Sequence, residues 1–159
     1  MPILVDADAC PVKEAIDSTA RAYGIEVIYV VSIAHWSDFY EGKETLRVDS
    51  EPEAADMRLM QYLKPGDLVI TDDFGLAALA LVKKAHALSF RGKIFLADEM
   101  DRLLLERHLK AKARRIGQYT GGPSKMIPAK KTHFLRQLTA WSQGQLSSFP
   151  ADKESEPAD

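Results

Sequence analysis

The architecture expected of the whole chain follows from residues 3–11, which read Ile3-Leu4-Val5-Asp6-Ala7-Asp8-Ala9-Cys10-Pro11. The apolar run Ile3–Val5 is short and partly β-branched, which is typical of a buried strand. Pro11 predicts the start of a helix, because a proline in the first helical turn gives up an N–H that would have no partner there. Residues 3–11 therefore predict the first half of a βαβ unit.

The alternation of strands and helices continues along the chain. The helix that starts at Pro11 is expected to end at Gly24. Further strands are predicted at Val27–Val31, Thr45–Val48, Asp67–Thr71, Ala87–Phe90 and Lys93–Leu96. Further helices are predicted from a capping box at Ser50 and Glu53 to Leu63, and over Leu76–Lys84, Asp98–Arg115 and Ala129–Ser142. This order predicts an α/β fold, a single doubly wound, mostly parallel sheet with helices on both faces.

The length of 159 residues fits one domain, which we expect to span residues 1–142. Residues 143–159 are rich in Ser, Gln, Pro, Asp and Glu and predict a disordered acidic tail, because they bury too little apolar surface to offset the entropy of ordering. A single cysteine excludes an internal disulfide and suits a reducing compartment. With no signal-like or membrane-length apolar run, we expect a cytoplasmic protein without a membrane or disulfide partner. The oligomeric state stays open.

Aspartates follow two of the predicted strands. Asp6 and Asp8 are two apart and should project together from the end of the first strand, at the sheet edge where open α/β sheets bind ligands. Asp72 and Asp73 follow Thr71 at the end of the fourth predicted strand. In each pair a carboxylate could instead cap the next helix. If the first and fourth strands are neighbours, these side chains meet.

Asp56 lies on the same predicted helix face as Leu59, Met60 and Leu63. A carboxylate on a core-facing stripe costs several kcal/mol unless it finds a partner, and a metal ion would supply one. The alternative is that Asp56 lies at the solvated edge of the stripe.

Carboxylates gathered without His or Cys ligands favour Mg²⁺ or Mn²⁺ over zinc. Such ions activate a water and stabilise the leaving oxygen of a phosphodiester. We therefore predict a catalytic metal site at Asp6, Asp8, Asp56 and Asp73, with Thr71 holding a metal-bound water or a phosphate. The histidines lack ligand spacing and are expected to be structural or surface residues. Cys10 lies at a predicted helix start, which lowers the pKa of a thiol, whereas the nearby aspartates raise it. The role of Cys10 therefore stays open.

Cations dominate the segment from Asp101 to Arg136, which suits a phosphate-backbone ligand such as RNA. A solvated helix face is the alternative. The predicted substrate contacts, besides Thr71, are Arg114, Arg115, Lys125 and Lys130. The turn Gly121-Gly122-Pro123 could bring the backbone close to a phosphate, or be only a turn.

The sequence resembles the YaiI/YqxD family of bacterial proteins, which is similar to the PIN-like superfamily, over about Met1 to Trp141. The resemblance is carried by Val5-Asp6-Ala7-Asp8-Ala9-Cys10-Pro11, by Pro65-Gly66-Asp67-Leu68-Val69-Ile70-Thr71-Asp72-Asp73 with Leu76-Ala77, and by Thr120-Gly121-Gly122-Pro123. It implies a sheet covered on both faces and an acidic, metal-binding pocket. It also implies that Asp6 is the first acid of the pocket, Asp56 the helix acid, and Asp73 rather than Asp72 the acid after the fourth strand. Asp8 lies where many PIN nucleases carry a non-acidic polar residue.

Three functions fit these features. The first is a Mg²⁺- or Mn²⁺-dependent, ribonuclease-like enzyme that cleaves phosphodiesters. The second is a phosphatase of the haloacid-dehalogenase type, with Asp6 as nucleophile and Asp8 as acid and base, although Cys10 replaces the Thr or Val of that class. The third is a non-catalytic module that binds RNA or a protein and holds a structural metal.

Overall fold

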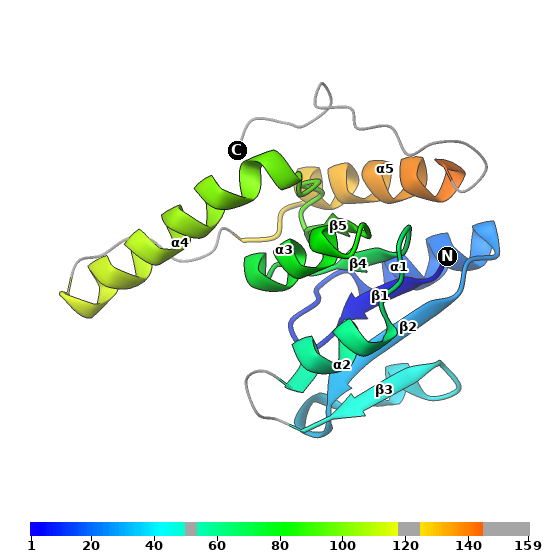
Figure 1. Cartoon of the computed structure of the whole chain (residues 1–159). Coiled ribbons are helices and arrows are strands. Elements are labelled where there is room, and N and C mark those ends of the chain that lie inside the picture. Colours follow the sequence, from blue (N-terminus) through cyan, green and yellow to red (C-terminus); the bar gives the residue numbers. More distant parts are fainter. Residues whose placement is uncertain (50–53, 118–124, 145–159) are drawn as a thin grey trace.

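The computed structural model describes residues 1–49, 54–117 and 125–144. Within these residues the sheet has five strands in the order β3-β2-β1-β4-β5, and every neighbouring pair is parallel (Figure 1). The strands are β1 (Ile3–Asp6), β2 (Val27–Ser32), β3 (Thr45–Val48), β4 (Leu68–Ile70) and β5 (His86–Leu88). The predicted α/β class with a parallel sheet is confirmed.

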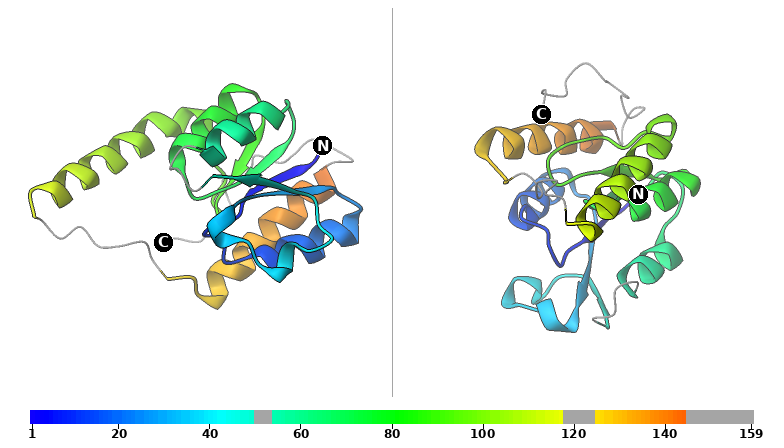
Figure 2. Two further views of the ribbon diagram at one scale, coloured as in Figure 1. Left: turned by 90° about the horizontal axis from the view of Figure 1, so that it is seen from below. Right: turned by 90° about the vertical axis from the view of Figure 1, so that its left-hand side faces the viewer.

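Helices connect the strands and cover both faces of the sheet. They are α1 (Lys13–Tyr23), α2 (Ala54–Tyr62), α3 (Phe74–Val82), α4 (Met100–Arg115) and α5 (Pro128–Gly144). Short 3₁₀ turns lie at η1 (Ile33–His35), η2 (Asp38–Tyr40) and η3 (Ala97–Glu99). Helix α4 projects beyond the sheet in Figure 1 and in the left view of Figure 2. Among the described residues, no helix has both the length and the apolar character needed to cross a bilayer.

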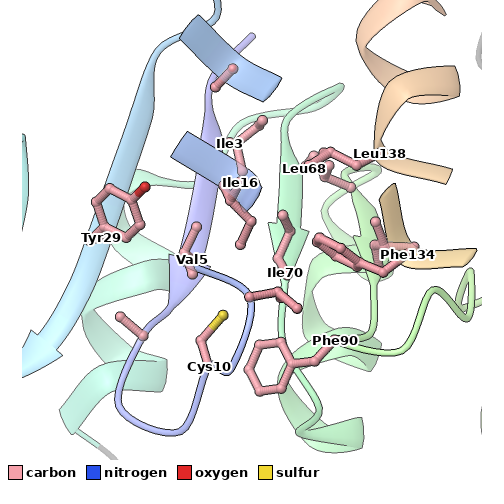
Figure 3. Close-up of a cluster of buried hydrophobic side chains, with 14 of the residues drawn as sticks. Ile3, Val5, Cys10, Ile16, Tyr29, Leu68, Ile70, Phe90, Phe134 and Leu138 are labelled. Carbon is pink, nitrogen blue, oxygen red and sulfur yellow. The ribbon is translucent and has the colours of Figure 1, made fainter. Parts of the chain in front are cut away.

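The core has two layers, because neighbouring residues of each strand point to opposite faces of the sheet. Ile3 and Val5 lie in the layer beneath α1 and α5, where Phe134 of α5 is fully buried (Figure 3). Leu4 lies in the opposite layer, which α2, α3 and the start of α4 cover. The alternation explains why Ile3–Val5 of β1 are all apolar: β1 is the central strand, and both of its faces are covered.

The structure differs most clearly from the sequence expectation at three places. Helix α1 starts at Lys13 rather than Pro11, because residues 11 and 12 form a turn and Val12 occupies the cap position. The predicted strand Lys93–Leu96 is reduced to a single antiparallel bridge between Ile94 and Leu88. Helix α5 continues to Gly144, into the segment expected to be a tail. The capping box at residues 50–53, the turn at 121–123 and residues 145–159 lie outside the described residues.

The strand order creates a switch point between β1 and β4. From β1 the chain builds outward through β2 and β3, and then returns to add β4 and β5 on the other side. The crossovers after β1 and β4 therefore leave to opposite faces of the sheet. At such a point the carboxyl ends of the two strands border a crevice, which is where open α/β sheets bind ligands.

Candidate functional site: aspartates at the carboxyl edge of the sheet

Asp6 is the last residue of β1, and its side chain turns toward the end of β4. Thr71 directly follows β4, and its hydroxyl donates a hydrogen bond of 2.8 Å to Oδ2 of Asp6. The same Thr71 oxygen accepts a hydrogen bond of 2.9 Å from the backbone N–H of Asp73. Thr71 is fully buried, so its hydroxyl has no water to replace these partners. The two strand ends are therefore joined across the switch point.

Asp8 contacts β2, the other strand that neighbours β1. Its Oδ1 accepts a hydrogen bond of 2.8 Å from the backbone N–H of Ser32, the last residue of β2. Its Oδ2 lies 3.5 Å from Nδ1 of His35, which is also 2.8 Å from the hydroxyl oxygen of Ser32. Asp8 lies in a turn closed by a hydrogen bond from the N–H of Cys10 to the carbonyl of Ala7. The expectation that Asp6 and Asp8 project together from one extended segment is therefore wrong.

Asp73 caps helix α3. Its Oδ1 accepts hydrogen bonds from the N–H groups of Gly75 at 2.8 Å and Leu76 at 3.2 Å. Nη1 of Arg107, on α4, lies 3.3 Å from the same oxygen. No described residue donates a hydrogen bond to its Oδ2. The capping role expected for one of the two adjacent aspartates thus falls to the residue that the family pattern singles out as an acid of the pocket.

Asp72 points instead toward the segment after β5. Its Oδ1 accepts a hydrogen bond of 2.8 Å from the N–H of Phe90, and its Oδ2 pairs with Nη1 of Arg91 at 2.5 Å. By contrast, helix α1 has no side-chain cap. The alternative that Asp6 or Asp8 caps that helix is therefore wrong, and both carboxylates need another explanation.

The carboxylates act on one another electrostatically. Burial raises the pKa of Asp6 above its usual value, and the negative charges of Asp73, Asp8 and Asp72 raise it further. The hydrogen bond from Thr71 lowers this pKa and only partly offsets the burial. A carboxylate in this position favours any cation or proton that comes near it. Asp6 is therefore the electrostatic centre of the site.

The described residues contain no group of three or more acidic, His or Cys side chains close enough to share one metal ion. Asp56 is partly buried in the first turn of α2. It borders a separate hollow of about 520 Å³ between α2 and α3. That hollow is lined by Asp56, Met57, Met60, Gln61 and Leu79. A four-aspartate cage is thus not preformed here.

The predicted cationic contacts are spread along the chain. Arg114 lines a basic hollow between α3 and α4, whereas exposed Arg115 does not. Lys125 is exposed just before α5, and Lys130 is half-buried in the first turn of that helix. Arg107 belongs to the basic segment predicted to bind RNA but was not among the named substrate contacts, and it contacts Asp73 directly. It links the basic hollow to the acidic site.

Cys10 is buried, and its sulfur points into the core beside Ile70 and Phe90 (Figure 3). Burial raises the pKa of its thiol to about 12, so the thiolate is scarce at neutral pH. The described geometry makes Cys10 a packing residue rather than a nucleophile.

The residues that sequence reasoning missed around Asp8 are Ser32 and His35. His35 was expected to be a structural or surface residue, and it is largely exposed but lies against an aspartate of the site. The available signal was its position directly after β2, the strand next to β1. Residues that follow neighbouring parallel strands converge at one edge, whatever their type.

Fold and site together define a class: an α/β domain whose parallel sheet carries aspartates at its topological switch point. A family model described as "Uncharacterized BCR, YaiI/YqxD family" matches residues 4–144, and the chain belongs to this family. The resemblance noted in the sequence is thereby confirmed.

Relatives match almost the whole chain. A UPF0178 protein of Listeria monocytogenes serovar 1/2a is 40% identical over 143 residues, which cover 90% of this chain and 96% of the relative. A UPF0178 protein of Shouchella clausii is 42% identical over 138 residues, which cover 87% and 90%. Among solved structures, a crystal structure of a variant of Rae1 (YacP) from Bacillus subtilis matches with a TM-score of 0.41 and 23% identity, over 73% of this chain and 84% of that chain.

Proposed function

We propose that this protein cleaves phosphodiester bonds in RNA with the help of Mg²⁺ or Mn²⁺, and that Asp6 is central to the reaction. The observation that carries the proposal is the position of Asp6 at the switch point, where it is partly buried and accepts the Thr71 hydroxyl at 2.8 Å, and where burial and the charges of Asp73, Asp8 and Asp72 raise its pKa. Perturbed carboxylates in the crevice of a sheet edge are candidates for catalysis or metal binding. A purely structural role would not need a partly buried carboxylate among the charges of three others.

The carboxylates fit a Mg²⁺-type ion that is bound by few protein ligands better than an ion that is coordinated by protein ligands alone. Such ions keep several waters and use one or two carboxylates together with substrate phosphates. Asp6 and Asp73 each keep one oxygen that receives no hydrogen bond from a described residue, and they are the side chains that would hold the ion. When bound, it would lower the pKa of a water and offset charge on the phosphate.

The chain's own residues supply the orientation. Thr71 fixes the carboxylate of Asp6 through its hydroxyl, and the cap on α3 fixes that of Asp73. Asp8 fastens the β1 turn to the end of β2 and keeps its negative charge near Asp6. Arg107 places a positive charge beside Asp73, where it can meet an incoming phosphate.

The test is cleavage of single-stranded RNA by wild type, Asp6→Asn and Asp38→Asn, each with Mg²⁺, Mn²⁺ or EDTA. Asp38 is exposed in η2 and provides a matched aspartate outside the site. We expect metal-dependent cleavage by wild type and Asp38→Asn, and at least a hundredfold loss in a folded Asp6→Asn, in the range of a lost electrostatic or acid–base contribution. Undiminished cleavage by Asp6→Asn would refute the proposal.

Metal binding by calorimetry separates the remaining possibilities. Micromolar Mn²⁺ binding that disappears in Asp6→Asn/Asp73→Asn supports the proposed ligands. RNA binding that persists in EDTA without any cleavage would favour the non-catalytic module, and turnover of small phosphomonoesters that is lost in Asp8→Asn would favour the phosphatase.

A further inference from the structure

A basic hollow lies between the start of α3 and the middle of α4. It has a volume of about 450 Å³. Its lining consists of Phe74, Lys93, Arg102, Leu103, Glu106, Arg107, Lys110 and Arg114. Phe74 directly follows the capping residue Asp73, so the hollow borders the acidic site without including it.

The positive charge of the hollow is only partly neutralised. Arg102 pairs with Glu106 at 2.8 Å, which is the one acidic residue in the lining. Lys110 and Arg114 form no ion pair with any described residue, and both are exposed. Lys93 adds a further cation from the segment after β5. The hollow therefore attracts an anion with more than one charge.

The cations on α4 form a line. Arg107, Lys110 and Arg114 are three and four residues apart, which places them on one face of the helix. From Arg107 to Arg114 they extend about 10 Å along the helix axis, at a rise of about 1.5 Å per residue. A stacked nucleic acid strand carries one phosphate for about every 3.4 Å. The line is thus long enough for about three successive phosphates.

The line also has a direction. Arg107 is at the end nearest the acidic site, where it lies 3.3 Å from Oδ1 of Asp73. Arg114 is next to the last residue of α4, and this end of the helix projects beyond the sheet (Figure 1). A linear polyanion lying along α4 would therefore reach the carboxyl edge of the sheet at Arg107.

We infer that this hollow is a binding site for the backbone of a single-stranded nucleic acid, which it guides toward Asp73 and Asp6. A hollow of about 450 Å³ can take up one flexible strand but is too small to admit a duplex. A linear spacing of cations favours a regular polyanion over an acidic protein, whose charges have no fixed repeat. Binding at the hollow stands on its own geometry, and only its role in delivering substrate rests on the proposed function.

The test measures binding without metal. A fluorescent single-stranded RNA of about 12 nucleotides, within the ~4–16 nucleotides that single-strand-binding folds cover, is titrated in EDTA by fluorescence anisotropy at several salt concentrations. The variants are Lys110→Glu/Arg114→Glu and, as control, Lys64→Glu/Lys84→Glu. Lys64 and Lys84 are exposed residues before β4 and β5, at the opposite edge of the sheet, so the control makes the same change in net charge.

We expect the hollow variant to bind roughly tenfold or more weakly, and its slope of log K against log salt to fall by about 1.4, at about 0.7 for each lost phosphate contact. The control should keep the wild-type slope. Equal weakening in both variants would reveal a general charge effect and overturn the inference. So would equal binding of a duplex, or of vesicles that contain anionic lipid.

The two proposals fail separately. Loss of EDTA-resistant binding in the hollow variant, with no cleavage by wild type, would support the hollow and refute the nuclease. Metal-dependent cleavage by wild type, with unchanged RNA binding by the hollow variant, would support the nuclease and refute the hollow.

Discussion

The hydroxyl of Thr71 donates to Asp6 across a separation of 65 residues in the chain, at an oxygen–oxygen distance of 2.8 Å. An ionised Asp6 carboxylate can only accept, so the hydroxyl proton of Thr71 points to it, while the same Thr71 oxygen accepts the N–H of Asp73. The end of β4 thus holds both the carboxylate that follows β1 and the loop that starts α3. One buried threonine sets the relative positions of two carboxylates.

Replacing Thr71 by Val should raise the pKa of Asp6 further, since the lost hydrogen bond is the contribution that lowers it. The change also leaves buried polar groups without a partner, at a cost of about 1–3 kcal/mol. Thr71→Ser keeps the hydroxyl and should leave the pKa close to that of wild type. Carboxyl titration by NMR gives the pKa, and urea unfolding gives the stability. A Val variant with an unchanged Asp6 pKa would contradict the assigned bond.

Asp6→Asn should become more stable than wild type as pH rises, measured with EDTA present. The folded-state pKa of Asp6 lies above the ordinary 3.8, so the folded chain holds this proton more tightly than the unfolded chain. The stability due to this group is complete below pH 3.8 and is lost as pH rises through the raised pKa. Asn carries no such proton, so the stability difference should grow above pH 3.8 and then level off. A difference that is constant with pH would show that Asp6 titrates normally.

Substitutions at Asp73 should separate its capping role from its charge. Asp73→Ala removes the acceptor for the N–H groups of Gly75 and Leu76 and should cost about 0.5–2 kcal/mol. Asp73→Asn keeps the cap and should cost much less in urea unfolding, while it weakens Mn²⁺ binding. If Asn and Ala lower the stability equally, charge rather than capping is what Asp73 contributes to the fold.

Cys10 should resist thiol reagents in the folded protein, because burial raises its pKa to about 12 and removes it from solvent. The rate of labelling should rise only as urea unfolds the chain, and Cys10→Ala should keep Mn²⁺ binding. Rapid labelling without denaturant would mean that the turn before α1 opens readily.

The sheet and the convergence of Asp6 with the acids after β4 were predictable, because each apolar run is short and helix-length segments separate the runs. Which of Asp72 and Asp73 would cap α3 was not predictable from residue type, since the two are identical neighbours. The backbone of Asp73, with φ of −80° and ψ of 111°, settles it by aiming that carboxylate at the helix N–H groups. Asp72 is left to bind the segment after β5.

The contacts of His35 and Arg107 depend on tertiary geometry that no local pattern carries. His35 reaches Asp8 only because η1 turns the chain back after β2. Arg107 reaches Asp73 only because α4 packs across α3. Pro11 predicts an earlier start of α1 than the structure shows. The helix starts later because the chain first completes the turn that the hydrogen bond from Cys10 to Ala7 closes.

The central place of β1 has a consequence for how the protein is made. β1 comes first in chain order, but it pairs with β4 through Ile3 and Leu68 as well as with β2. At a synthesis rate of about 5–20 residues per second, β1 emerges from the ribosome on the order of 3–13 s before its second partner exists. During this interval the apolar residues Ile3–Val5 of β1 have no partner strand along one edge. Nascent chains stalled before Leu68 should therefore bind chaperones, and chains extended past Leu88 should release them.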